Sequence, residues 1–354
     1  MNVLDLARPE IRALQPYSSA RMESGSAAIM LNANESPWPP PGHDSGLNRY
    51  PDPQPESLRT RLADLYGVDV DNLMIGRGSD EAIDLLVRAF CRPGVDAIAI
   101  SPPTFGMYAV CANIQGAAVV NAPLDEDFKL DPETVLEAVS SDVKVLFVCS
   151  PNNPTGGLVP LDVIEQLTAT LRGRAMVVVD EAYIEFASAA SATGLVARYP
   201  NLGVLRTLSK AWALAGARIG CLAADPQVIA LLRRIMPPYP LPTPCVAAAE
   251  AALDESGQRV TARRVADTVA ERNRMANLLQ QMPGVKAVLP SRANFLTVRL
   301  AHAAGVCRHL AAQGIVVRDL GRQARLADCL RFSIGTAQEN SRLIQALSQL
   351  TEVA

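Results

Sequence analysis

The amino-acid sequence predicts an α/β fold, in which helices cover both faces of a mostly parallel β-sheet, followed by a smaller α+β unit. From about Pro55 onward, helical and strand-like segments alternate, which is typical of strands joined by crossover helices. Several strand-like segments are continuous apolar runs without polar alternation, as expected when both faces of a parallel sheet are covered. The proline-rich segment 237–244 interrupts this alternation, and a long, charged helical pattern follows it.

The residues before this alternation predict an irregular amino-terminal arm. They are rich in turn formers and end in a proline-rich run, 36–42, which cannot continue a helix or a central strand. Charged residues interrupt the first 20 positions, so we expect no secretory signal and interpret the chain as cytosolic. The expected organisation is an arm at 1–45, a large domain at 46–245 and a small domain at 246–354.

Individual elements are placed from their apolar patterns. In the large domain, strands are expected at 97–100, 143–149, 176–180, 204–208 and 220–223, with helices at 57–66, 80–90, 104–115 and 161–171. In the small domain, helices are expected at 259–281 and 306–313, with strands at 294–300, 315–318 and 329–334.

The composition is that of a protein that buries a large core and binds small molecules. Of 354 residues, 49% are hydrophobic, which is enough for one large core and a smaller one. The net charge of -3, without a long basic run, does not favour nucleic acid or anionic membrane as a partner. No stretch approaches the ~20 apolar residues of a membrane-spanning helix. The seven cysteines contain no Cys-x-x-Cys and the three histidines no zinc-ligand spacing, so we expect neither disulfides nor a metal site.

Two reactive residues follow expected strands of the large domain. In open parallel sheets, ligands bind beyond the carboxyl ends of the strands. Asp180 follows three valines, where a carboxylate is costly unless a cation or a strong donor meets it. Lys210 follows another apolar strand, and a lysine amine that is desolvated or close to other cations becomes a nucleophile for an aldehyde. The alternatives are a helix cap or buried ion pair for Asp180 and a solvated loop residue for Lys210.

Three further candidates lie near strand ends. Asn153 belongs to the stiff turn 150–156, which can hold an amide side chain in one orientation. Phe105 follows an apolar strand and presents an aromatic ring, and Tyr183 comes three residues after the strand-end aspartate. The alternatives are an Asx-turn for Asn153 and core packing for Tyr183.

The segment 76–81, Gly-Arg-Gly-Ser-Asp-Glu, leads directly into an apolar helical pattern. Backbone N–H groups and the positive end of a helix dipole can hold a phosphate at such a position. The segment matches neither Gly-x-Gly-x-x-Gly nor the P-loop pattern. Capping of the helix by Ser79 or Asp80 is the commoner role of such residues, and the two roles can coexist.

Together these residues fit one ligand, an aldehyde-bearing pyridine phosphate. Lys210 would react with its aldehyde and Asp180 would face its ring nitrogen. Tyr183 and Asn153 would contact the ring hydroxyl, and Phe105 would cover a face of the ring. The residues that would bind the phosphate are Ser79, Asp80, Ser209 and Arg218.

Several motifs resemble known families in their order and spacing. Fold-type I pyridoxal-phosphate aminotransferases share three of them: Ser-Pro-Asn-Asn-Pro-Thr-Gly at 150–156, Asp-Glu-Ala-Tyr at 180–183 and Thr-Leu-Ser-Lys-Ala-Trp-Ala-Leu-Ala-Gly-Ala-Arg at 207–218. The histidinol-phosphate aminotransferase family is more narrowly similar at Leu-Asn-Ala-Asn-Glu (31–35), Asn-Arg-Tyr-Pro-Asp-Pro-Gln-Pro (48–55), Pro-Pro-Thr-Phe-Gly-Met-Tyr (102–108) and Leu-Arg-Phe-Ser-Ile-Gly-Thr (330–336). The similarity covers nearly the whole chain.

The resemblance implies a seven-stranded sheet and pyridoxal 5'-phosphate as the cofactor. Lys210 would hold the cofactor as a Schiff base and, once displaced by substrate, act as the base and acid that moves a proton. Asp180 would keep the ring nitrogen protonated, so that the ring withdraws electrons. Thr207 would join the residues that bind the cofactor.

The resemblance also implies a homodimer with shared active sites. Tyr50 is similar to a family tyrosine that reaches the cofactor phosphate of the other subunit, and packing within a proline-rich loop is the alternative. Phe105 is a departure, because many relatives carry tyrosine there. Stacking on the ring is retained, but any hydroxyl contact is lost.

Substrate recognition is assigned from the same resemblance. Arg331 falls where the family's carboxylate-binding arginine lies, and a guanidinium can grip a carboxylate or a phosphate. Arg318 and Tyr17 are further candidates for the substrate phosphate, and Asn153 also borders the substrate. Each of these residues could instead be solvated or structural.

The implied reaction converts L-histidinol phosphate and 2-oxoglutarate to imidazole acetol phosphate and L-glutamate by a ping-pong mechanism in histidine biosynthesis. Three alternatives stay open: an aromatic amino-acid aminotransferase, a threonine-phosphate decarboxylase and a noncatalytic pyridoxal-phosphate protein.

Overall fold

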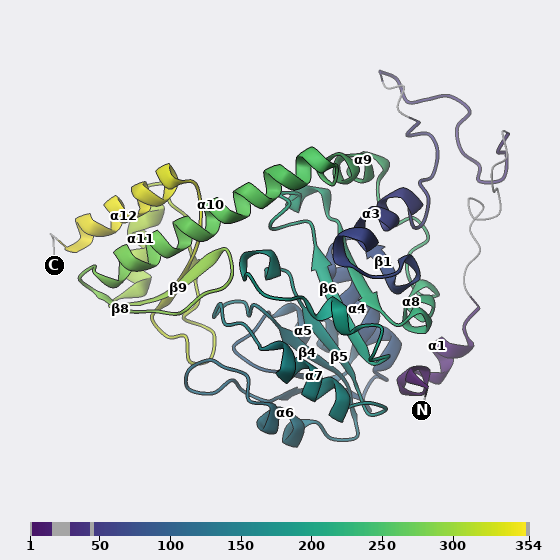
Figure 1. Ribbon diagram of the computed structural model, residues 1–354, viewed down its shortest axis with the longest axis horizontal. Helices are drawn as coiled ribbons and strands as arrows, with labels where there is room; N and C mark the ends of the chain where they lie inside the picture. The colour runs from purple at the N-terminus through teal and green to yellow at the C-terminus, as the bar shows by residue number, and fades with distance from the viewer. Residues whose placement is uncertain (1, 16–28, 43–45, 352–354) are drawn as a thin grey trace.

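The larger of two sheets forms the centre of the molecule. The computed structural model describes residues 2–15, 29–42 and 46–351 (Figure 1). The seven strands of this sheet have the order β1-β7-β6-β5-β4-β2-β3. The strands β3, β2, β4, β5 and β6 are parallel, whereas β7 is antiparallel to β6 and β1. The strands are β1 (Leu73–Gly76), β2 (Ala97–Ile100), β3 (Ala118–Asn121), β4 (Val143–Cys149), β5 (Met176–Asp180), β6 (Leu202–Thr207) and β7 (Gly220–Ala224).

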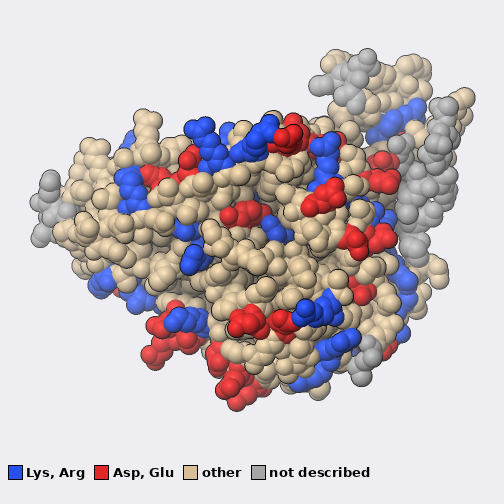
Figure 2. Space-filling model, viewed as in Figure 1, with Lys and Arg blue, Asp and Glu red and all other residues tan. Residues whose placement is uncertain are grey.

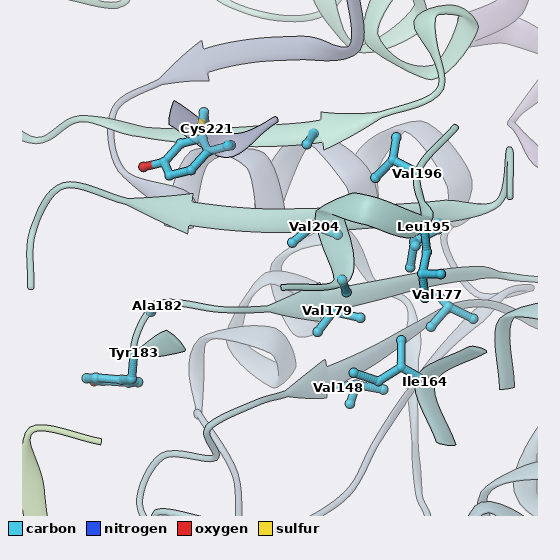
Figure 3. Packing of buried hydrophobic residues seen from close by; sticks show 14 of the residues in the cluster. Val148, Ile164, Val177, Val179, Ala182, Tyr183, Leu195, Val196, Val204 and Cys221 are labelled. Atoms are coloured by element: carbon cyan, nitrogen blue, oxygen red, sulfur yellow. The ribbon is translucent and has the colours of Figure 1, made fainter. Parts of the chain in front are cut away.

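Helices cover both faces of this sheet, which explains the continuous apolar strands. On β5, Val177 and Val179 belong to one apolar cluster, whereas Met176 and Val178 belong to the cluster on the opposite face. Figure 3 shows the first cluster, in which valines of adjacent strands pack beside Ile164. That face is covered by α3 (Glu56–Tyr66), α6 (Pro132–Ala138), α7 (Leu161–Thr170) and α9 (Thr243–Ala252), and the other by α4 (Ser79–Phe90), α5 (Met107–Gln115) and α8 (Pro226–Arg233).

The second sheet is antiparallel and has the order β10-β11-β9-β8. Its helices pack on it through a separate apolar cluster that includes Leu279, Leu296 and Leu343. The long helix α10 runs from this sheet to α9 beside the larger sheet (Figure 1). The α/β fold with a smaller α+β unit is therefore confirmed. The elements are α10 (Glu255–Gln280), β8 (Val285–Val288), β9 (Phe295–Leu300), α11 (Ala303–Ala312), β10 (Arg318–Asp319), β11 (Cys329–Ser333) and α12 (Ala337–Thr351).

The strand expected at 315–318 is wrong for most of its length. Only Arg318 belongs to a strand, the two-residue β10. The backbone N–H of Ile315 instead donates to Leu310 O at the end of α11, and Val316 is 90% exposed. The apolar residues at 315–317 predicted a strand but form a partly exposed connection between α11 and β10. Their sequence alone does not distinguish such a connection from a strand.

Three predicted helices begin three or four residues from the expected position, including α11, which begins at Ala303 rather than at 306. Helix α5 begins at Met107 rather than at 104, because the Thr104 hydroxyl donates to Asn152 Oδ1 and ties the preceding segment to a neighbouring turn. Helix α10 begins four residues before the predicted start, because the Asp254 side chain accepts from Gly257 N and caps it. The sequence prediction missed β1, β3, β8, α6, α8, α9 and α12. It also missed the short helix α1 (Pro9–Ala13) in the arm that was expected to be irregular.

The proposed domain boundaries stay a prediction, although position 245 falls inside α9. Across the described ranges, the structure contains no helix both long enough and apolar enough to cross a membrane. Acidic and basic side chains are interspersed over the face shown in Figure 2. Within the larger sheet, the carboxyl ends of β4, β5 and β6 lie at one edge, and the predicted reactive residues follow these strands.

Candidate active site

A cavity of about 260 Å³ lies at the carboxyl edge of the larger sheet. It brings together side chains that are far apart in the sequence, from strand ends, from the start of α4 and from β11. Among the predicted residues it is lined by Ser79, Asp80, Phe105, Asn153, Asp180, Tyr183, Thr207, Ser209, Lys210, Arg218 and Arg331.

Lys210 lies in the turn after β6, inside this cavity. Lys210 is exposed in the single chain, but partial desolvation by the cavity walls lowers the pKa of its ammonium group. The positive charges of Arg331 and Arg218 lower this pKa further, against the opposing influence of nearby carboxylates. Its Nζ atom is 5.6 Å from the centroid of the Tyr183 ring. A larger fraction of this amine is therefore neutral, and hence nucleophilic, than of an ordinary lysine at the same pH.

Reductive trapping of an aldehyde is expected to label Lys210 at lower pH than the chain's other three lysines. The reason is its lowered pKa, since only the neutral amine adds to a carbonyl. Peptide mass mapping after treatment of cofactor-free protein with an aldehyde and cyanoborohydride, over a pH series, measures the effect. Exposed Lys286 is the internal control. Coincident pH profiles for Lys210 and Lys286 would contradict the expectation.

Asp180 ends β5 and is only 3% exposed. Burial raises the pKa of its carboxyl group, and two hydrogen bonds oppose this by stabilising the ionised form. The Tyr108 hydroxyl donates to Oδ2 at 2.7 Å, and the Ala182 backbone N–H donates to Oδ1 at 3.1 Å. These bonds fix the orientation of the carboxylate at the wall of the cavity.

The start of α4 forms a cradle of backbone groups. Gly78 precedes the helix with φ of 78° and no side-chain cap, so Ser79 and Asp80 belong to the first turn rather than to a cap. A Cβ atom on Gly78 would lie 2.7 Å from Arg218 Nη2, and one on Gly220 would lie 2.4 Å from Ser79 N. Glycine is required at 220 because a side chain there would meet backbone, and at 78 because of its positive φ. The capping alternative is not the one adopted here.

Arg218 extends the cradle. It has a left-handed backbone (φ 56°), and its Nη2 donates to Asp80 Oδ2 at 3.2 Å. Thr207 and Ser209 meet nearby through their hydroxyl groups, 3.0 Å apart. An arginine, two hydroxyl groups and the positive end of a helix thus border the same cavity, which is a suitable environment for a phosphate.

Asn153 lines the cavity, whereas the adjacent Asn152 holds the turn together. The Asn152 amide donates to Pro103 O and to Thr155 Oγ1. The Asn153 side chain instead accepts a hydrogen bond from Arg331 Nη1. The Asx-turn alternative is therefore not the role that the structure gives Asn153.

Arg331 comes from β11 and reaches the site from the smaller sheet. Its guanidinium lies 5.2 Å from the ring centroid of Phe295, which also packs edge-on against Tyr183. Burial lowers the pKa of Arg331, and the charge of Arg318 lowers it further. An anion bound here would offset both the loss of hydration of the Arg331 guanidinium and its repulsion by Arg318.

Two predicted residues, Tyr50 and Arg318, are not brought into the cavity. Tyr50 is 48% exposed and stacks on Tyr239, with ring centroids 4.4 Å apart. Arg318 is the strand partner of Arg331 and shares with it a neighbouring cavity of about 470 Å³. Tyr17 lies outside the described residues.

Several cavity residues were missed from the sequence. Cys149 ends β4 and lines the cavity, and its position at the end of an apolar strand was a usable signal. Burial raises the pKa of this thiol to about 12, so it stays neutral. Tyr108 and Phe295 do not line the cavity but contact the lining residues Asp180 and Tyr183, respectively. No local sequence pattern distinguishes them from ordinary core aromatics.

The expected pyridine phosphate fits these residues. A nucleophilic amine and an oriented carboxylate share one cavity, and a glycine-dependent cradle with Arg218 borders the same space. Each group matches one part of the ligand: the aldehyde, the ring nitrogen and the phosphate.

Comparison with known proteins gives concordant results. The family model "Aminotransferase class I and II" matches residues 24–347. Histidinol-phosphate aminotransferase from Xanthomonas axonopodis pv. citri (strain 306) is 52% identical over 358 residues, covering 100% of this chain and 99% of that protein. The histidinol-phosphate aminotransferase structure from Sinorhizobium meliloti in complex with pyridoxal-5'-phosphate has a TM-score of 0.78 and 27% identity, covering 86% of this chain and 84% of its own. The histidinol-phosphate aminotransferase structure from Clostridium acetobutylicum has a TM-score of 0.79 and 24% identity, covering 87% of this chain and 92% of its own. At that identity the comparison shows a similar fold only.

Proposed function

This chain belongs to the class I and II aminotransferase family, and on that premise we propose that it interconverts L-histidinol phosphate and imidazole acetol phosphate, with 2-oxoglutarate and L-glutamate as the partner pair. The observation that carries the proposal is the 52% identity to a histidinol-phosphate aminotransferase over the whole chain. The protein is a pyridoxal 5'-phosphate enzyme, and its reaction is a step of histidine biosynthesis. The family, the activity and the cofactor predicted from the sequence are confirmed.

Lys210 and Asp180 are assigned the two reactive roles. When bound, the cofactor supplies an aldehyde and an electron-withdrawing ring. The neutral amine of Lys210 would hold the cofactor at that aldehyde and, once displaced by substrate, would move a proton from the substrate Cα to the carbon of that aldehyde. The buried carboxylate of Asp180 would keep a proton on the ring nitrogen. The lowered pKa of Lys210 and the fixed orientation of Asp180 support these roles.

The remaining cavity residues position the cofactor. Tyr183, Asn153 and Phe105 line the cavity. Tyr183 and Asn153 would contact the ring hydroxyl, and Phe105 would cover a face of the ring. Asp80 acts indirectly, because its carboxylate would repel a phosphate but holds Arg218 in place. The groups that bind the phosphate are the first N–H groups of α4 and the side chains of Ser79, Thr207, Ser209 and Arg218.

Arg331 is assigned to the anionic end of both substrates. A planar guanidinium accommodates the phosphate of histidinol phosphate in one half-reaction and a carboxylate of 2-oxoglutarate in the other. Its place in the cavity, beside Asn153, supports this role. Arg318 borders the adjoining cavity and is a second contact for the substrate phosphate. Tyr17 is assigned to the substrate from the family resemblance alone.

We also propose that the chain works as a cytoplasmic homodimer. Large apolar side chains of the arm are exposed in the single chain, including Ile29 at 79%, Leu31 at 89% and Trp38 at 75%. A second copy that covers them would also bring Tyr50 to the neighbouring cofactor phosphate. Light scattering should give twice the chain mass, and a monomeric mass at working concentration would refute the shared site.

A spectroscopic titration tests the proposed reaction. The visible band of the bound cofactor should be lost on addition of histidinol phosphate and return on addition of 2-oxoglutarate. Phenylalanine is the comparison donor, and faster conversion with it would indicate an aromatic aminotransferase. Release of CO2 from threonine phosphate without an amino acceptor would indicate the decarboxylase.

A further inference from the structure

Tyr108 is a fully buried residue of α5 whose hydroxyl group donates to the Asp180 carboxylate at 2.7 Å. The tyrosine approaches from the face of the larger sheet that α4 and α5 cover, and its ring lies in the apolar cluster on that face. A phenol is not needed to fill this space, because phenylalanine has almost the same shape. The hydroxyl group therefore calls for an explanation other than packing.

The ring of Tyr108 is held from two sides. It stacks on Phe147 of β4, with centroids 4.7 Å apart and planes 5° apart. Phe105, which lines the cavity, packs edge-on against it at 5.5 Å. Because the ring is fixed by a strand and by an aromatic wall, the hydroxyl group is presented to Asp180 in one orientation.

The charged groups around Asp180 have opposing effects on its ionised form. Lys210 stabilises the negative charge of Asp180, whereas Asp80 opposes it, and the neighbouring Cys149 thiol is neutral. The two donors, Tyr108 and the Ala182 N–H, are therefore the main stabilising contacts within the described structure, against a large cost of burial. A hydrogen bond to a carboxylate stabilises that form relative to the protonated acid.

We propose that Tyr108 is a positioning residue that keeps the shared proton on the cofactor ring nitrogen rather than on Asp180. The proposal rests on the proposed function, in which Asp180 faces that nitrogen. Without the hydroxyl group, Asp180 binds the proton more tightly, the ring becomes neutral and its capacity to withdraw electrons falls. The backbone donor at Ala182 cannot replace it, because it serves the other carboxylate oxygen.

The ¹⁵N resonance of bound cofactor labelled at the ring nitrogen tests the proposal in Tyr108→Phe. The signal should move from the protonated toward the neutral position, with kcat reduced about tenfold, the size expected for one hydrogen bond to a charged group, and KM for both substrates nearly unchanged. Tyr66→Phe is the matched control. Tyr66 is also a buried tyrosine, and its hydroxyl group has no hydrogen-bond partner among the described residues, so the ¹⁵N signal should not move.

A double-mutant cycle separates positioning from packing. In an Asp180→Asn background, Tyr108→Phe should cause no further loss of kcat, because the amide carries no charge to stabilise. Equal losses in both backgrounds, or an unmoved ¹⁵N signal in a well-folded Tyr108→Phe variant, would overturn the proposal. Failure of the wild-type protein to bind the labelled cofactor would instead refute the proposed function.

Discussion

Replacing Lys210 with alanine is expected to abolish the visible absorbance band of covalently held cofactor and transamination together. Among the described residues no other lysine lines the cavity, so no second lysine amine is placed to attach to the aldehyde there. The proton at the substrate Cα also loses its base. Loss of a positioned base alone reduces a rate by ~10²–10⁴-fold, so turnover should fall by at least this much. Absorbance of the reconstituted variant and single-turnover rates with histidinol phosphate are the measurements.

Lys144→Ala is the matched control for this substitution. Lys144 lies near the amino end of β4, at the edge of the same sheet away from the cavity, and its ammonium group donates to Ser141 O. Its replacement should leave the spectrum and the rate unchanged. Near-normal turnover in Lys210→Ala would disprove the assignment of this lysine.

Replacing Arg331 with alanine is expected to weaken both half-reactions. Each substrate brings an anionic group to the same guanidinium, and a hydrogen bond to a charged group contributes about 1.5–3 kcal/mol. We therefore expect kcat/KM to fall roughly 10- to 100-fold for histidinol phosphate and for 2-oxoglutarate alike. Part of the loss has an indirect cause, because Asn153 also loses its hydrogen bond from Arg331. Half-reaction kinetics with each substrate separately give the two values.

Two further variants sharpen this test. Arg331→Lys keeps the positive charge but lacks the planar guanidinium that binds an anion through two hydrogen bonds. It should retain part of the activity in both half-reactions. Arg318 borders the adjoining cavity and is assigned to the substrate phosphate. Because 2-oxoglutarate has no phosphate, Arg318→Ala should affect histidinol phosphate alone. If Arg331→Ala impaired only one substrate, the dual use of this arginine would be wrong.

The core of the larger sheet was predictable because its strands are buried on both faces. In β4 and β5 the apolar runs end where the strands end, so their predicted bounds match the structure. Among the missed strands, β1 is buried throughout but has only four residues, whereas two others have mixed exposure. Strand β3 at the edge of the sheet and β8 in the smaller sheet have no fully buried residue, and their sequences therefore lack a strong periodic signal.

The site divides in a similar way. Residues at strand ends, such as Asp180 and Lys210, were identified because position and chemistry are visible together in the sequence. Tyr108 was not identified as a site residue, because its function depends on a contact across 72 positions. The same is true of Phe295, which holds Arg331 and Tyr183 from the smaller sheet.

The sequence by itself determined the parallel sheet, the family and the proposed set of reactive residues, because these depend on local apolar patterns and on contiguous motifs. Only the tertiary structure decided how those residues are tuned. Partial desolvation and neighbouring charges lower the pKa of Lys210, and two donors from separate elements orient Asp180. Of two adjacent asparagines, the packed structure assigns Asn152 to the turn and Asn153 to the cavity. Electrostatic and hydrogen-bond environments arise between segments distant in the chain, so no local pattern encodes them.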